Sequence, residues 1–134
     1  MRTISGRRGN TAITGLAAFL GAVIFFLVLY GLYAGINDVA ARSSAVRQAG
    51  NVAAVLDSVG SCPAYCRAKY MLPDKLFGRT YLLRISGNRV TISLSSPQYN
   101  ASGVFFSNLS DDFSASGGVN LTITKNNTVF EVTK

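Results

Sequence analysis

The sequence predicts an α+β protein, in which a long N-terminal hydrophobic helix precedes a small antiparallel β sheet or sandwich. Two observations predict this class. The chain has 134 residues, and no charged residue occurs between Asn10 and Asn37. From Thr80 onward, apolar residues instead alternate with polar ones, which is the period of a strand with one buried face.

The first element is the hydrophobic run, which is apolar throughout Leu16–Tyr30. About 20 apolar residues cross the hydrocarbon core of a bilayer, so the run is long enough to span it. The alternative is a core helix, but a helix of a small soluble domain is rarely apolar on every face. Arg7 and Arg8 precede the run, and Asp38 is the first charge after it. Because basic residues stay on the cytoplasmic side, we expect the N-terminus inside and the C-terminal part at the cell surface.

The helical pattern continues beyond the run. Apolar positions recur at spacings of three, four and seven, and polar residues occupy other faces. The apolar positions are Val39, Val46, Ala49, Ala53 and Leu56, and the polar ones are Arg42, Arg47, Gln48, Asn51 and Asp57. No proline precedes Pro63. We therefore expect one helix from about Thr11 to Ser58, roughly 70 Å long, whose second half packs one face against the outer domain.

Four glycines interrupt the hydrophobic run, at Gly15, Gly21, Gly31 and Gly35. Gly31 and Gly35 form a GxxxG pattern, which permits close approach of two helices in a membrane. Glycine is also simply frequent in transmembrane helices, so a packing role stays an open alternative.

The only two cysteines, Cys62 and Cys66, come after the helix, and the chain has no histidine. Two thiols without other soft ligands make a poor zinc site, and the spacing is not that of CxxC redox motifs. Outside the cell we expect the two to form a disulfide; two free buried thiols are the alternative. No metal or cofactor is expected.

About five strands are expected, joined by loops rich in Ser, Gly and Asn. The expected strands are Tyr81–Ser86 and Arg89–Leu94 around a Gly87–Asn88 turn, Val104–Leu109, Val119–Thr124, and Thr128–Val132 after a turn at Lys125–Asn127. A sheet of this kind would bury its apolar face against the amphipathic half of the helix.

Four N-x-S/T sequons occur in the last part of the chain, at Asn100, Asn108, Asn120 and Asn126. Each is a possible N-glycosylation site of an exported protein. Sequons also arise by chance in a sequence rich in Ser, Thr and Asn, so their occupancy is a hypothesis.

No catalytic constellation is recognisable, and we do not expect an enzyme. Asp111 and Asp112 are adjacent in a loop, whereas a general acid/base pair must face one substrate across a cleft. The other acidic residues of the outer domain, Asp74 and Glu131, are isolated.

Basic residues cluster in the first part of the outer domain. They are Arg67, Lys69, Lys75, Arg79, Arg84 and Arg89. This stretch could attract anionic glycans, DNA or an acidic cell-wall layer, or it is simply a solvated face. The formal charge of +7 includes Arg2, Arg7 and Arg8, which belong to a targeting signal, so no specific nucleic-acid partner is expected.

The motif Arg7-Arg8-Gly9-Asn10-Thr11-Ala12 places a basic pair and a glycine directly before the hydrophobic run. It resembles the class III signal peptide of archaeal type IV pilins and archaellins. The resemblance implies that residues 1–9 are a leader, cut between Gly9 and Asn10. It departs from bacterial type IV pilins at Thr14, where those carry a glutamate. An ordinary secretory signal is the alternative, because small residues also occur after the run at Ala34–Gly35 and Ala40–Ala41.

The resemblance further implies a helix over residues 10–60 and an extracellular β-rich domain over 61–134. Residues 72–81, which lead into the Gly87–Asn88 hairpin, also resemble, more loosely, the segment after the helix in archaeal pilin-like proteins. The implied function is the subunit of an adhesive, glycosylated filament. Its partners would be copies of itself, a prepilin peptidase, and an assembly ATPase with its membrane platform. The alternative is a membrane-anchored protein that is archaellum stator-like or binds the surface layer.

Overall fold

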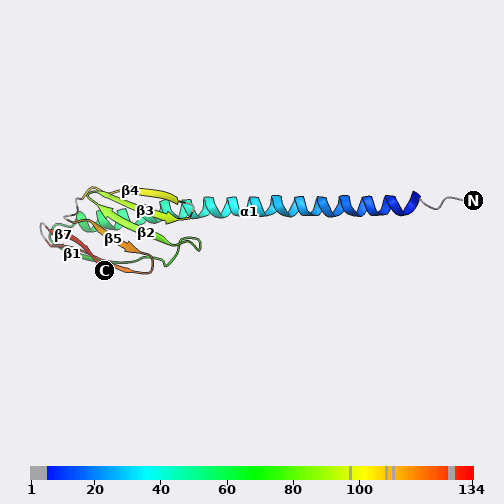
Figure 1. Cartoon of the computed structure of the whole chain (residues 1–134). Helices are drawn as coiled ribbons and strands as arrows, with labels where there is room; N and C mark the ends of the chain where they lie inside the picture. Colours follow the sequence, from blue (N-terminus) through cyan, green and yellow to red (C-terminus); the bar gives the residue numbers. More distant parts are fainter. Residues whose placement is uncertain (1–5, 97, 108, 110, 127–128) are drawn as a thin grey trace, which may run out of the picture. The chain divides into compact units, whose positions relative to one another are not determined.

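The computed structural model describes residues 6–96, 98–107, 109, 111–126 and 129–134, and it describes side chains from residue 12 onward except that of residue 129 (Figure 1). Within these residues it contains one helix, α1 (Gly6–Gly60), followed by seven strands in two antiparallel sheets. The expected α+β class is confirmed. The chain divides into two units, residues 1–37 and 38–134, and α1 runs continuously through the boundary.

The second unit contains both sheets. Its strands are β1 (Tyr65–Met71), β2 (Tyr81–Ser86), β3 (Arg89–Ser95), β4 (Gln98–Val104), β5 (Phe113–Ser116), β6 (Asn120–Asn126) and β7 (Val129–Thr133). A three-stranded sheet has the order β1-β6-β7, and a four-stranded sheet has the order β4-β3-β2-β5. All the pairings are antiparallel.

The predicted β2–β3 hairpin is confirmed. Ser86 pairs with Arg89 across the two-residue turn, and Gly87 has a φ of 58°. Positive φ at this position is what a tight hairpin turn requires and what glycine tolerates without strain. The two strands alternate buried and exposed residues along their length, so the hairpin buries one face as the alternation predicted.

The prediction of a strand at Val104–Leu109 is wrong, because β4 ends at Val104. Phe105 is fully buried, whereas Phe106 is 98% exposed. The backbone amides of Phe105 and Leu109 donate to the carbonyls of Asn88 and Gly87. These apolar residues thus form a loop that closes the end of the core. The strand itself lies in the more polar segment before them, where only Ala101 is buried.

Besides β4, the strands β1 and β5 were not anticipated. In β1, Cys66, Ala68 and Tyr70 are half-buried and alternate with exposed residues that include Arg67 and Lys69. These charges mask the apolar alternation. The strand β5 has only four residues, which is too short for a reliable periodic signal.

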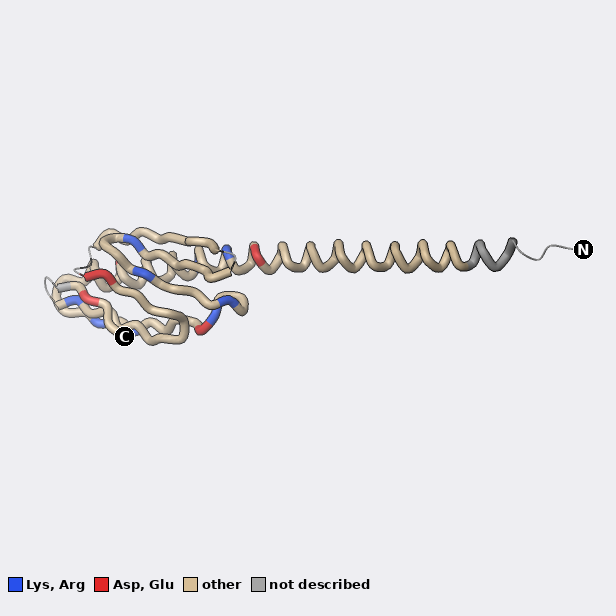
Figure 2. Tube along the Cα trace, viewed as in Figure 1, with Lys and Arg blue, Asp and Glu red and all other residues tan. Residues whose placement is uncertain are grey.

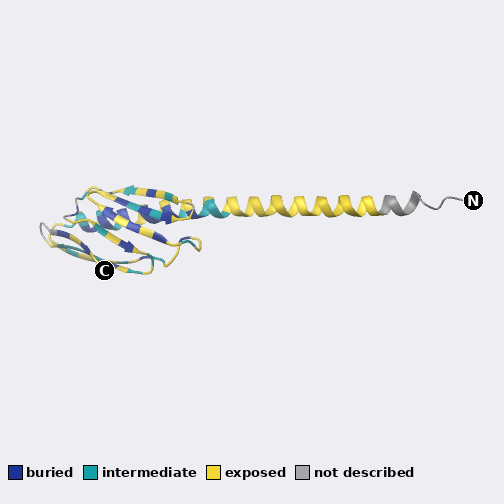
Figure 3. Cartoon of the chain, in the orientation of Figure 1, coloured by how far each residue is buried: buried dark blue, intermediate teal, exposed yellow. Residues whose placement is uncertain are grey.

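The second half of α1 covers the sheets with a stripe of mostly small residues (Figure 3). The stripe is Ala41, Ala45, Gln48, Ala49, Val52, Ala53, Leu56 and Val59. The predicted face was partly wrong, since Val39 and Val46 are 67% and 50% exposed. Gln48 is buried instead and donates to the hydroxyl of Tyr70 at 3.0 Å, a bond that satisfies its amide nitrogen in the core.

The core that the helix covers is apolar on both sheets. Its largest fully buried side chains are Phe105, Leu56, Leu72, Leu83, Ile85, Ile92, Leu94, Leu121 and Ile123. All of these side chains belong to residues 38–134, which therefore bury an apolar interior of their own.

Candidate functional site: the exposed apolar helix and its junction with the domain

The first part of α1 exposes its apolar side chains on every face. All residues from Ala12 to Ile36 are exposed (Figure 3), and Figure 2 shows no charged residue among them. The large side chains include Ile13, Leu16, Phe19, Leu20, Ile24, Phe25, Phe26, Leu27, Tyr30, Leu32, Tyr33 and Ile36. The helix is long and apolar enough to cross a membrane, with a mean hydropathy of 2.6 in its most apolar stretch.

The glycines of this segment have free space around them. A Cβ added to Gly15, Gly21, Gly31 or Gly35 would meet nothing within 4 Å. Nothing within the described chain therefore requires these residues to be glycine. The space beside them is available for close packing of a molecule outside this chain.

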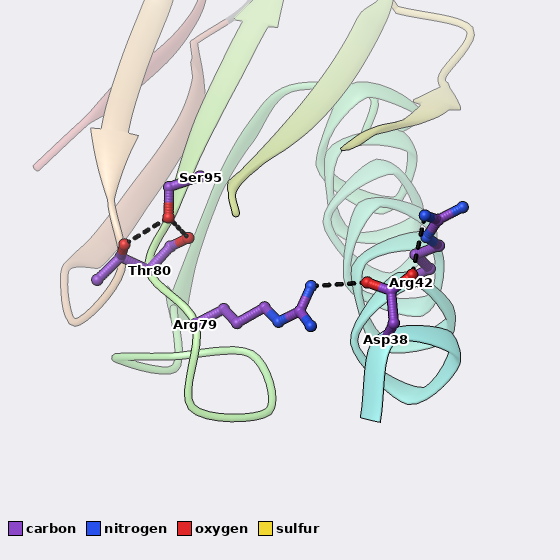
Figure 4. Close-up of polar contacts among 5 residues, drawn as sticks. All are labelled: Asp38, Arg42, Arg79, Thr80 and Ser95. Atoms are coloured by element: carbon purple, nitrogen blue, oxygen red, sulfur yellow. Dashed lines mark hydrogen bonds and ion pairs between the residues drawn. The ribbon is translucent and has the colours of Figure 1, made fainter. Parts of the chain in front are cut away.

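Asp38, the first charged residue after the apolar segment, links the helix to the outer domain (Figure 4). Its two carboxylate oxygens pair with Arg42, one turn further along α1, and with Arg79, in the loop before β2, both at 2.8 Å. Asp38 and Arg79 are only about a quarter exposed, so this pair is less screened by solvent than a surface ion pair. The guanidinium of Arg42 also lies 5.2 Å from the ring centroid of Tyr99, a cation–π distance.

The end of α1 is tied down by different contacts. The half-buried ammonium of Lys125, on β6, donates to the carbonyls of Gly60 and Cys62, the latter at 2.7 Å. A cation at this position satisfies carbonyls that the helix leaves unpaired and complements its dipole. Cys62 forms a disulfide with Cys66, with 6.2 Å between their Cα atoms. The pairing is the expected one, and it joins the helix end to β1.

The sequon asparagines lie on different parts of the domain. Asn100 is exposed on β4, Asn120 on β6, and Asn126 at the end of β6. Asn108 lies outside the described residues, as do two partners of Asn126 in its sequon, residues 127 and 128. The three described asparagines are exposed in the folded chain, and glycosylation stays a prediction.

The expected basic stretch is not one surface. Arg67 and Lys69 are exposed on β1 of the three-stranded sheet. Arg84 and Arg89 belong to the other sheet, and Arg79 is committed to Asp38. Because the charges are divided in this way, a single extended anion-binding face is not formed from them.

Asp112, one of the adjacent acidic pair, contacts β2. The hydroxyl of Ser86 donates to Asp112 at 2.7 Å, and Arg84 lies 3.4 Å from it. These two contacts, with the hydroxyl the larger cause, hold the pKa of Asp112 below its ordinary value. The residue is therefore an ionised surface carboxylate. Among the described residues, no group of three His, Cys, Asp or Glu side chains is placed to hold a metal ion.

The backbone at the predicted cleavage position is helical. Gly9 and Asn10 lie in the first turns of α1, and residues 1–5 of the predicted leader lie outside the described residues. Leader cleavage stays a prediction.

Comparisons with models of protein families, with curated proteins and with solved structures found no match for this chain. The structural class of the protein is therefore defined by its fold and by its exposed apolar helix. It is an α+β protein in which a helix long and apolar enough to span a membrane continues into a small domain of two antiparallel sheets. The comparisons give no further identity.

Proposed function

We propose that this protein is the structural subunit of an extracellular filament of the type IV pilus kind, serving adhesion or surface attachment. One observation carries the proposal: the apolar side chains of residues 12–36 are exposed on every face of α1, while residues 38–134 bury a separate core. Such a surface must be removed from water. A bilayer removes it before assembly, and the helices of neighbouring subunits remove it in a filament.

The glycines of the apolar segment support assembly over permanent residence in lipid. Each lowers helix propensity by up to about 1 kcal/mol relative to alanine, and a Cβ added at any of them would meet nothing within 4 Å in the described part of the chain. In a helix bundle the missing side chains let the backbones approach closely. The proposed partners are other copies of the chain, with a prepilin peptidase and an assembly machinery implied by the resemblance of the leader.

The test is to shear surface material from the native cells and examine it by electron microscopy and mass spectrometry. Filaments that contain this protein, with Asn10 as the mature N-terminus, are the expected result. Protein that starts at Met1 and stays with the membrane would instead support the anchored, surface-layer-binding alternative. A start after Ala34 or Ala40 would mean a secreted domain and would refute both.

A variant sharpens the test. Gly31→Leu adds a side chain at a position where a Cβ would meet nothing within 4 Å, so the subunit should fold and enter the membrane as before. We expect it to reduce filament yield severely, because the larger side chain holds neighbouring helices apart. Gly50→Leu, at an exposed helix position of the outer unit that is also open, is the matched control.

A further inference from the structure

The loop between β1 and β2 carries an unusual aromatic residue at its tip. Phe77 is 64% exposed and has a φ of 50°, and the next residue, Gly78, has a φ of 74°. Leu76 and Arg79 exchange two backbone hydrogen bonds around this pair, so the tip is a two-residue turn with both central residues at positive φ. Asparagine and glycine are the residues that favour such a turn, and a bulky side chain there is a conformational outlier.

The domain itself gains little from this side chain. The buried core does not include Phe77, although it includes its neighbour Leu76, which is 4% exposed. Phe77 instead borders a shallow hollow beside α1, together with Ala40, Ser43, Ser44 and Arg47. A large apolar group kept exposed in a disfavoured backbone conformation indicates a role toward something outside the domain.

The location of the tip indicates which external surface Phe77 contacts. Arg79, two residues after Phe77, pairs with Asp38 at 2.8 Å, and Asp38 directly follows the last residue of the apolar segment. At 1.5 Å per residue, Ala40 lies about 5 Å and Arg47 about 15 Å beyond Asn37 along the helix axis. The headgroup layer on each side of the hydrocarbon core is roughly 5–8 Å thick. The hollow therefore begins at the depth of the headgroups when the apolar segment spans a bilayer.

The length of the apolar segment favours contact. From Asn10 to Asn37 it is about 42 Å long, which exceeds the roughly 30 Å of the hydrocarbon core. A segment that is too long is accommodated by tilting, by kinking or by local thickening of the bilayer, and any of these keeps Asn37 near the edge of the hydrocarbon core. Lys75 lies two residues before Phe77 on the loop, and Arg47 borders the same hollow as Phe77. Cations near the surface are attracted to anionic lipids.

We propose that the Phe77 loop is a membrane-surface anchor: in the membrane-inserted subunit, Phe77 enters the headgroup layer of the outer leaflet. The anchor sets the orientation of the outer domain on the bilayer. It does not depend on whether the subunit later polymerises, so it stands apart from the proposed filament.

A second exposed aromatic residue provides the control. Phe106 is 98% exposed and borders a hollow with Ala54, Asp57, Ser58 and Ser61. The α1 positions among these, from Ala54 to Ser58, lie about 25–32 Å beyond Asn37 along the helix axis, well past the headgroup layer. Phe77 and Phe106 thus have the same chemistry at opposite ends of the helix half that covers the sheets.

The chain has no tryptophan, so Phe77→Trp and Phe106→Trp each introduce a single reporter. The full chain is reconstituted in phosphatidylcholine/phosphatidylglycerol vesicles, with and without a lipid that carries a nitroxide on its headgroup. We expect the nitroxide to quench the Phe77→Trp fluorescence several-fold more strongly than that of Phe106→Trp. Equal quenching of the two reporters would overturn the proposal.

A second copy of the chain is the competing occupant of this surface. Weak nitroxide quenching at position 77, together with a blue shift that grows with protein density in the vesicle, would assign the tip to a contact between copies and would also overturn the anchor. Circular dichroism of both variants, matching that of the unchanged chain, verifies that the reporters leave the fold intact.

Discussion

The close approach of β4 to the helix makes Gly103 sensitive to the addition of a side chain. A Cβ added there would lie 2.8 Å from the carbonyl oxygen of Ala49, 3.1 Å from its carbonyl carbon and 3.3 Å from the Cβ of Ala53. Two of these three atoms belong to the helix backbone, which cannot move as the end of a flexible side chain can. Gly103→Ala must therefore push β4 away from α1.

Two opposing effects set the change in the free energy of unfolding that Gly103→Ala causes. Overpacking of a core contact costs about 1–3 kcal/mol. Replacing glycine by alanine at a compatible backbone conformation returns about 0.4–1 kcal/mol through the unfolded chain, and Gly103 is not among the glycines at positive φ. We expect a net loss of about 1–2 kcal/mol in the free energy of unfolding.

Gly50→Ala is the matched control, because Gly50 is an exposed helix residue with nothing within 4 Å of the added Cβ. It should stabilise the domain by up to about 1 kcal/mol. Guanidinium unfolding of the full chain in mild detergent, followed by fluorescence of its six tyrosines, measures both. If Gly103→Ala stabilises the protein as Gly50→Ala does, the close contact between β4 and α1 is refuted.

Three further predictions concern single side chains of the domain. Lys125→Met leaves the carbonyls at the end of α1 without their cation and should cost about 1–2 kcal/mol in the same unfolding assay, whereas Lys69→Met, on an exposed strand position, should change little. Burial raises the pKa of Tyr81 to about 12, and the hydroxyl of Tyr81 donates to the carbonyl of Pro73 at 2.6 Å. The free energy of unfolding should therefore keep its full value below pH 10 and fall by up to about 2–3 kcal/mol as the pH rises to 12. Tyr81→Phe should remove most of this fall, and an unchanged pH profile would contradict the assignment. Phe77→Asn relieves the backbone conformation of the loop tip and should raise the free energy of unfolding by about 1 kcal/mol; a loss of stability would mean that the ring supports the domain.

Local patterns were enough to predict the two most regular features. The apolar run from Asn10 to Asn37 needs only its own composition to be recognised as a helix that excludes water. The β2–β3 hairpin needs only alternating side chains and a Gly87–Asn88 turn. The disulfide between Cys62 and Cys66 could also be predicted from the sequence, because no other cysteine or histidine competes for either thiol.

The sequence did not determine which strands fill the rest of the sheets. Tyr65 of β1 pairs with Asn126 of β6, far along the chain, and β4 is a strand because β3 offers it an edge. Neither segment has a strong period of its own. Their backbone groups are satisfied by partners that no local window contains.

The buried face of the helix was likewise decided by tertiary contact. Val39 and Val46 belong to the apolar pattern but stay exposed, while Gln48 is buried because Tyr70 is placed to accept its hydrogen bond. Small residues such as Ala45 and Ala49 are weak signals in a sequence, yet they form the surface on which β4 and Gly103 can lie closely. Hydrophobicity thus determined that a helix and a hairpin would form, because each depends on neighbours in the chain. Which faces meet depended on shape and hydrogen bonding between distant segments, which only the folded chain brings together.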